Sequence, residues 1–284
     1  MKRTQPKRTQ LKRTQLKRIA LYLALFMGAA VAVAPYLMTL NSAFKEPAKV
    51  LTTPAWEPAF PVTLGNFAKV WSEYDMAGFL LHSLVYAGAV TVGQVVFSTM
   101  AAYAFGRMSF PGRDALFWGY LATMMVPQIV TLVPLFLIMR EFGLIDTYLG
   151  LILPTAFGTP YGIFLVRQYF RTIPRDLESA ARIDGAGTWT VLTRVVLPLS
   201  RPILATLATI TFITTWNTLL WPLIITNGDA VRVVTLGISA LKGQYSSQYH
   251  LILAAAALAL LPLIVIFLLF QRHIVRSIAL TGLK

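Results

Sequence analysis

The charged residues of this chain leave six long gaps between them. No Asp, Glu, Lys or Arg occurs in residues 19–44, 76–106, 115–139, 147–166, 202–228 or 243–271. Each gap holds at least 20 residues, which is the length that an α-helix needs to cross the hydrocarbon core of a bilayer. Strands of a membrane barrel would alternate in polarity, and these segments do not. The pattern predicts an all-α integral membrane protein with six transmembrane helices.

The gaps place the helices roughly at 19–40, 79–105, 115–138, 148–168, 203–225 and 250–271. Composition agrees with a membrane location, because 13% of the residues are charged, against about 25% in a typical soluble domain. The first apolar segment is too long for the core of a signal peptide and lacks a convincing cleavage site. We therefore expect it to remain as a helix.

Six prolines fall inside the expected spans: Pro127, Pro134, Pro154, Pro160, Pro222 and Pro262. A proline within a helix removes one backbone donor and tends to kink the helix. Broken helices suit a transporter that changes between two states, but proline is also common in ordinary transmembrane helices. The prolines alone leave both interpretations open.

The basic residues are unevenly divided between the two sets of connecting segments. If the N-terminus is inside the cell, 19 of the 25 Lys and Arg residues lie in cytoplasmic segments. Such an excess on the cytoplasmic side is the general rule for membrane proteins. We expect a multi-pass protein of the cell membrane whose termini, and whose polar connection 172–202, face the cytoplasm.

Residues 2–16 repeat the pentapeptides KRTQP and KRTQL, and residues 1–18 hold eight basic residues and no acidic one. Such a tail is a candidate for nucleic-acid binding or lipid sensing. It has no interleaved aromatic residues for base stacking, and it adjoins a membrane helix. We interpret residues 1–18 as a disordered tail held at anionic membrane lipids, without a nucleic-acid partner, and residues 19–284 as the transmembrane domain.

The connection 172–202 has the features of two short helices joined by a sharp turn. Pro174 suits a helix start, and Gly185 is placed to end that helix in a left-handed conformation. Thr188 is a candidate cap for a second helix, which Pro198 would terminate. One face of the first helix gathers Leu177, Ala180, Ala181 and Asp184. Such a helix is suited to lie in the groove of a partner.

This connection resembles the cytoplasmic loop of the membrane subunits of binding-protein-dependent ABC importers. The matching residues are Glu178, Ser179, Ala180 and Ala181, then Asp184, Gly185 and Ala186, and finally Leu197 and Pro198. The family more often has alanine in place of Ser179, and serine is similarly small. The resemblance implies that this loop is the coupling helix that docks on the ATPase subunit.

Other stretches are similar to sugar-importer permeases of the maltose type, on the side of the G subunit. They are AYAF at 102–105, MMVP at 124–127, GLIDTYLGL at 143–151, FLVRQ at 164–168, WN at 216–217, WP at 221–222 and the residues 271–284. One departure is His82, where the family more often has Asn. The resemblance covers nearly the whole chain from Ile19 onward and implies the fold of a type I ABC importer permease.

The resemblance also implies a set of partners. The chain would pair with a second permease subunit and bind two ATPase subunits. It would receive a sugar or related polyol from an extracytoplasmic binding protein, and disaccharides, oligosaccharides, sugar alcohols and glycerol phosphates all fit. Since the sequence has no P-loop, ATP and Mg²⁺ would bind to the ATPase subunits, and no cofactor would bind to this chain.

Two further groups of residues are candidates for contact with the solute or the binding protein. Aromatic, amide and hydroxyl groups suit sugars, so the candidates to line the solute path are Thr215, Trp216, Asn217 and Trp221. The alternative for these is helix–helix packing. In the resembled family an outer loop reaches the binding protein, which points to Gly243, Gln244, Tyr245 and Ser246. The alternative there is a plain solvated loop.

The sequence lacks the marks of an enzyme. It has no cysteine, no HExxH or GxSxG motif, and no pair of carboxylates at membrane depth, and its three histidines are too scattered for a metal site. We therefore expect a non-catalytic permease subunit. The alternative function is a stand-alone secondary carrier or channel, which would need inverted-repeat halves and an ion site. Neither feature is evident.

Overall fold

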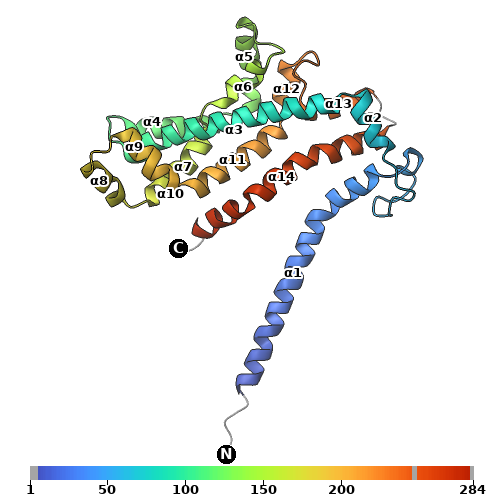
Figure 1. Cartoon of the computed structure of the whole chain (residues 1–284), viewed down its shortest axis with the longest axis horizontal. Helices are drawn as coiled ribbons and strands as arrows, with labels where there is room; N and C mark the ends of the chain where they lie inside the picture. The colour runs from blue at the N-terminus through green and yellow to red at the C-terminus, as the bar shows by residue number, and fades with distance from the viewer. Residues whose placement is uncertain (1–5, 245–247, 282–284) are drawn as a thin grey trace, which may run out of the picture. The chain divides into compact units, whose positions relative to one another are not determined.

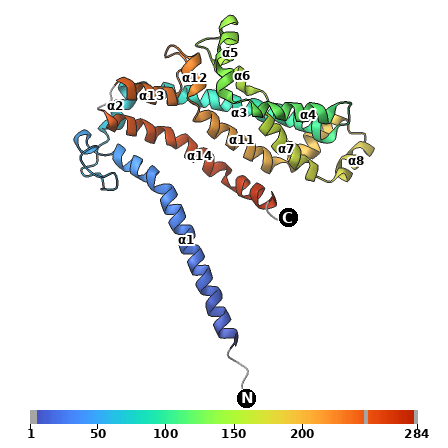
Figure 2. The same ribbon diagram turned by 180° about the vertical axis from the view of Figure 1, so that it is seen from behind.

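The structure, a computed structural model, describes residues 6–244 and 248–281 (Figures 1 and 2). Within these ranges the side chains of 6–14, 16, 242–244 and 273–281 are not described. Every regular element in the described part is a helix, which confirms the all-α prediction. The chain divides into two compact units, which are Met1–Val70 with Tyr245–Leu258 and Trp71–Gln244 with Ala259–Lys284.

The helices follow one another in this order: α1 (Pro6–Ala43), η1 (Pro47–Lys49), α2 (Gly65–Glu73), α3 (Met76–Arg107), α4 (Arg113–Ala122), η2 (Thr123–Met125), α5 (Gln128–Glu141), α6 (Tyr148–Ala156), α7 (Pro160–Thr172), α8 (Arg175–Ile183), α9 (Thr188–Thr190), η3 (Val191–Val196), α10 (Leu197–Leu199), α11 (Arg201–Trp216), α12 (Leu220–Ile225), α13 (Val234–Gln244) and α14 (Tyr249–Thr281). α1 takes in most of the tail that was expected to be disordered. That segment has no glycine and is rich in Lys, Arg, Gln and Leu, which favour helix.

Within the described residues, three helical segments are long and apolar enough to cross a membrane, namely Lys17–Ala43, Met76–Arg107 and Tyr249–Arg272. Three further pairs pass the same test together, although each is bent at a short break. The bends are 98° between Arg113–Met125 and α5, 43° between α6 and α7, and 79° between Thr188–Leu199 and α11. If each bent pair is one broken span, the number is six, which equals the number of charge-free gaps. The third pair begins at Thr188, however, which lies before the span expected at 203–225.

The bent pairs differ from the continuous helices expected at 115–138 and 148–168. Before α5 the backbone becomes extended at Val126, with φ −81° and ψ 116°. Pro127 explains this break, because a proline disfavours helical geometry in the preceding residue and offers no N–H. Pro160 likewise begins α7 after a break of three residues. Three other prolines remain inside helices: Pro134 in α5, Pro154 in α6 and Pro262 in α14.

The helix expected at 203–225 is also divided, between α11 and α12. The break falls one turn before Pro222, whose ring would crowd the carbonyl four residues earlier and could not donate to it. That carbonyl belongs to Thr218, and it accepts instead from the hydroxyl of Thr235 at 2.9 Å. A side chain from α13 thus satisfies the group that the proline leaves without a helical partner.

α3 is the helix against which α6, α7 and α11 pack (Figure 1). A side chain at Gly93 would come within 2.5 Å of the carbonyl oxygen of Ala156, so glycine is needed for this close approach. The neighbouring Gln94 donates to the carbonyl of Thr155 (2.8 Å) and accepts from the hydroxyl of Thr211 (3.4 Å). One buried amide therefore joins α3, α6 and α11.

The start of α3 is joined to the start of α13. His82 Nδ1 lies 3.1 Å from the carbonyl oxygen of Arg232, and since a carbonyl only accepts, Nδ1 carries the proton. Ser83 Oγ accepts from the backbone N–H of Val234 at 2.7 Å. An Asn at position 82 would also end in a donor, so the departure from the resembled family preserves this type of contact.

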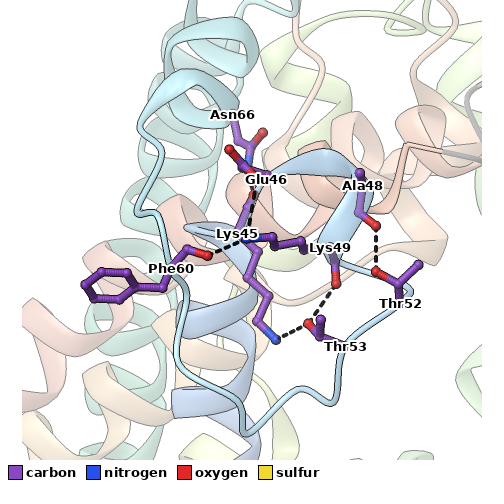
Figure 3. Close-up of polar contacts among 8 residues, drawn as sticks. All are labelled: Lys45, Glu46, Ala48, Lys49, Thr52, Thr53, Phe60 and Asn66. Atoms are coloured by element: carbon purple, nitrogen blue, oxygen red, sulfur yellow. Dashed lines mark hydrogen bonds and ion pairs between the residues drawn. The ribbon is translucent and has the colours of Figure 1, made fainter.

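The segment between α1 and α2 is held by buried polar groups (Figure 3). Lys45 is 2% exposed, and its ammonium donates to the Thr53 hydroxyl at 2.9 Å and the Pro54 carbonyl at 2.7 Å. The amide of Asn66 donates to the carbonyls of Ala43 and Lys45, each at 2.8 Å. These bonds give the segment a defined shape although it contains only one short 3₁₀ turn.

We expect Lys45→Met to loosen this segment, because it keeps the apolar stem and removes both bonds to residues 53 and 54. Hydrogen bonds to a charged group contribute about 1.5–3 kcal/mol each. Amide hydrogen exchange over residues 50–60 should become faster. Lys49→Met is the control, since Lys49 is 41% exposed and its bond to the Phe60 carbonyl is accessible to water. Equal rates of amide hydrogen exchange over residues 50–60 in the two variants would contradict the role of Lys45 in holding this segment.

Candidate functional site

The connection between α7 and α11, residues 173–200, forms two helical arms and is called the elbow below. Its first arm, α8, ends as predicted, because Gly185 has φ +80°. The N–H of Gly185 bonds to the carbonyl of Arg182 (3.0 Å), and that of Ala186 reaches back to Ala181 (2.9 Å). This pair of bonds is the Schellman ending of a helix, which requires a left-handed residue.

The second arm runs from Thr188 to Leu199 through α9, η3 and α10. The prediction that Thr188 caps this arm is wrong, because Gly187 occupies the cap position without a side-chain bond and Thr188 is already helical. Pro198 does not end the arm at once. The preceding turn widens into a π-helix, which makes room for the proline ring, and the arm ends at Ser200.

Glu178 is the buried residue of α8, at 8% exposure. Its Oε1 lies 3.2 Å from Nε of Arg107. The two groups form an ion pair, but the geometry between these two atoms does not meet that of a hydrogen bond. Ala181, Ala186 and Leu197 pack against a buried apolar cluster beneath the elbow. The remaining residues of the predicted motif are exposed: Ser179, Ala180, Asp184, Gly185 and Pro198.

Arg107, the last residue of α3, also binds the end of α7. Its Nη2 donates to the carbonyl oxygens of Phe170 and Ile173, the latter at 2.6 Å. Its side chain is 3% exposed. In the sequence, Arg107 was counted only among the cytoplasmic charges. Its position directly after a long charge-free span could have drawn attention to the residue, but not to its partners.

A polar hollow of about 420 Å³ lies beside this ion pair. It is lined by Arg107, Met108, Ser109, Arg175, Glu178, Ser179, Arg182 and Thr188. Three guanidinium groups and one carboxylate therefore surround it, which leaves a positive excess on this side of the elbow.

Four large apolar side chains of the elbow are exposed. Ile183 is 86% exposed, Trp189 64%, and Leu177 and Leu199 45% each. Exposed apolar side chains of this size make the elbow a candidate contact surface for another molecule. Leu177 was placed on a helix face from the sequence, whereas Ile183, the last residue of α8, was not singled out.

A second buried arginine lies near the same end of α3. Arg167 Nε donates to the carbonyl of Phe105 (3.1 Å), and its Nη2 lies 3.6 Å from the carboxylate of Asp114. Its guanidinium carbon stands 3.9 Å from the centre of the Phe117 ring. Arg167 thus joins α7 to α3 and α4, while Arg107 joins α7 and α3 to the elbow.

The four candidates for the solute path are not gathered on one exposed surface of this chain. Trp221 is 2% exposed, and its Nε1 donates to the carbonyls of Gly150 and Leu151 at 3.2 and 3.3 Å. Trp216 is buried against Phe212, with ring centres 5.7 Å apart, and Thr215 is buried as well. Asn217 is exposed and donates to the carbonyl of Ile213.

The candidate contact loop lies largely outside the described residues. Gly243 and Gln244 end α13 without described side chains, and Tyr245 and Ser246 are outside the described part. Among the described residues, no group of three His, Asp or Glu side chains is placed to hold a metal ion.

Comparison with known proteins places these features in a family. The model of the binding-protein-dependent transport system inner membrane component matches residues 94–280. The diacetylchitobiose uptake system permease protein of Streptomyces coelicolor is 31% identical over 258 residues, which cover 90% of this chain and 85% of that protein. The sn-glycerol-3-phosphate transport system permease protein of Yersinia pestis is 34% identical, over 90% of this chain and 94% of that protein.

Solved structures agree with this fold. A chain of a bacterial ABC transporter involved in the import of the acidic polysaccharide alginate has a TM-score of 0.79 and 22% identity, covering 92% of this chain and 97% of that chain. A bacterial alginate ABC transporter in complex with alginate pentasaccharide-bound periplasmic protein gives a TM-score of 0.66, with 16% identity over 91% and 95% of the two chains. The predicted importer permease fold is confirmed. The chain belongs to the family of inner membrane components of binding-protein-dependent transport systems.

Proposed function

We propose that this chain is one of two membrane subunits of an ATP-driven importer for a sugar or a related polyol. Its relatives are named for diacetylchitobiose, arabinooligosaccharides and sn-glycerol-3-phosphate, and its structural neighbours for alginate. A neighbour in complex with a saccharide-bound periplasmic protein supports delivery of the solute by a binding protein. Family membership favours this function over a stand-alone carrier or channel.

ATP and Mg²⁺ bind, in this proposal, to two separate ATPase subunits, and this chain is non-catalytic. The absence of a P-loop from its sequence supports that division. The excess of Lys and Arg in the segments that include the elbow supports a cytoplasmic position for the elbow and both termini.

The elbow is the contact for the ATPase subunits. The observation that carries this assignment is the exposure of the apolar side chains of Ile183, Trp189 and Leu177. Of the three carboxylates of the elbow, Glu178 is turned inward, whereas Asp176 and Asp184 are exposed. An amphipathic helix with exposed apolar anchors is suited to a groove on a partner. The guanidinium groups of Arg175 and Arg182 beside it would favour an acidic rim on that groove.

Movement of the ATPase subunits would shift the elbow and, through it, the core. The elbow continues directly into α11 through a bend of 79°, and α11 packs against α3. Broken helices are suited to change their angles without loss of their internal hydrogen bonds. The mechanism is a two-state equilibrium that nucleotide binding shifts from a distant site.

Thr215, Trp216, Asn217 and Trp221 stay candidates for the solute path, with Asn217 favoured because its side chain is exposed. Burial of the two tryptophans supports a structural role for them, as supports for the helix that carries Asn217. The stretch of Gly243, Gln244, Tyr245 and Ser246 stays a candidate contact for the binding protein.

We expect Gly185→Val to uncouple ATP hydrolysis from transport while the chain still inserts into the membrane. A left-handed conformation costs an L-residue about 1–2 kcal/mol, so valine would distort the turn between the two arms. Uptake per ATP hydrolysed should fall in the reconstituted importer, supplied with its binding protein.

Gly187→Val is the matched control. Gly187 has φ −70°, and both glycines have open space around them, so the two variants differ mainly in backbone conformation. Normal uptake per ATP in Gly185→Val would contradict a role in coupling for the left-handed turn at Gly185. An equal loss of uptake per ATP in both variants would contradict it as well.

We also expect Ile183→Asp to weaken binding of the ATPase subunits. Ile183 is exposed in this chain and would become buried on docking. The carboxylate of the Asp variant would then be buried without a partner, which costs binding free energy. The ATPase subunits retained on the purified permease should decrease, whereas Ile183→Leu should retain them. Full retention by the Asp variant would show that this surface does not contact the ATPase.

A further inference from the structure

We propose that Arg107 is a positioning residue for coupling, which clamps the junction between α7 and α8 so that the elbow and the helical core move as one body. This inference rests on the proposed role of the elbow as the ATPase contact. It adds the residue that holds the elbow in place.

Arg107 contacts both sides of the junction. On the α7 side, its Nη2 donates to the carbonyls of Phe170 and Ile173. On the α8 side, its Nε lies 3.2 Å from the carboxylate of Glu178. Only Ile173 and Pro174 separate the two helices, so these contacts determine the direction in which α8 leaves α7.

The junction has an apolar restraint, because Ile173 is buried in the cluster beneath the elbow and its N–H bonds to the carbonyl of Phe170. Pro174 is the cap residue of α8, and it makes no side-chain bond there. α8 has nine residues, and a helix of this length is marginal without tertiary contacts. The ion pair from α3 adds the charged contact that holds α8 itself, while the Schellman ending orders its other end.

Burial and charge keep this ion pair closed. The side chains of Arg107 and Glu178 are 3% and 11% exposed, so water competes weakly for either group. Glu178 is the one carboxylate that lines the hollow, beside the guanidinium groups of Arg107, Arg175 and Arg182. A planar guanidinium suits contact with two carbonyls and a carboxylate from different directions.

A distance between α8 and α3 tests the clamp directly. The chain has no cysteine, so spin labels can be placed at Asp176→Cys and Val96→Cys, both exposed positions on these two helices. The distance distribution is measured by pulsed electron paramagnetic resonance in the assembled importer, without nucleotide and with ATP and vanadate. We expect one narrow distance, which is the same in both states.

Arg107→Gln and Glu178→Gln should each widen or split this distribution, because each removes the ion pair and leaves a neutral polar side chain. The double variant should be no worse than Arg107→Gln alone, since that change already removes the ion pair together with the two carbonyl bonds. Arg107→Lys, which keeps the charge, should recover part of the narrow distance. A distribution in Arg107→Gln as narrow as in the unmodified chain, in both states, would overturn the proposal.

Arg167→Gln is the matched control. Arg167 is also buried, with 9% of its side chain exposed, and it also donates to a backbone carbonyl, that of Phe105 in α3. Its ion-pair partner, however, is Asp114 on α4. Its variant should keep the narrow distance between α8 and α3. If the distance distribution widened equally in both arginine variants, the proposal would be overturned, because Arg107 would then only stabilise the fold.

The two proposals fail in different measurements. If the elbow does not contact the ATPase, Ile183→Asp keeps its ATPase subunits whatever the distance distribution shows. If the elbow is the contact and Arg107 does not hold it, Ile183→Asp loses the ATPase subunits while Arg107→Gln keeps a single narrow distance.

Discussion

A bilayer offers no water to an unpaired backbone group, and this chain breaks its apolar helices at several points. Side chains from neighbouring helices repair these breaks. Between α6 and α7, the Tyr120 hydroxyl donates to the carbonyl of Gly158, and Thr159 accepts from the N–H of Gly162. Before α12, the Thr235 hydroxyl donates to the carbonyl of Thr218, four residues before Pro222. The bent spans therefore depend on close packing around α3, which the glycines and Gln94 of that helix allow.

The same helix reaches the elbow through its last residue. Arg107 and Arg167 lie near one end of α3 and bind backbone carbonyls of α7 and α3, but only Arg107 also pairs with α8. This arrangement turns Glu178 toward the protein and leaves apolar side chains such as Ile183 outward. We infer that the elbow offers its exposed apolar side chains to the ATPase, while the carboxylate of Glu178 holds the elbow to the core.

Much of the fold followed from local sequence, because membrane spans depend on length and apolarity and a left-handed turn depends on Gly185. Local sequence did not locate the break at Pro127, because Pro134 and Pro154 remain inside helices and a continuous helix was expected at 115–138. The partners of Arg107 are 63 and 66 residues away at the α7 carbonyls, so no local pattern indicated the clamp. Trp221 suited a sugar path by residue type, but contacts with α6 bury it. Residues that meet only in the folded chain were the ones that sequence reasoning missed.

The most direct test of the central claim is photo-cross-linking from the elbow in native membranes. Since the chain has no cysteine, a benzophenone maleimide can be attached at Ile183→Cys alone, with Phe142→Cys, another exposed apolar position, as the control. If the elbow contacts the ATPase subunit, Ile183→Cys gives a covalent product with that subunit and Phe142→Cys gives none. Cross-linking of Ile183→Cys to lipid alone, in membranes where the assembled complex is present, would contradict it.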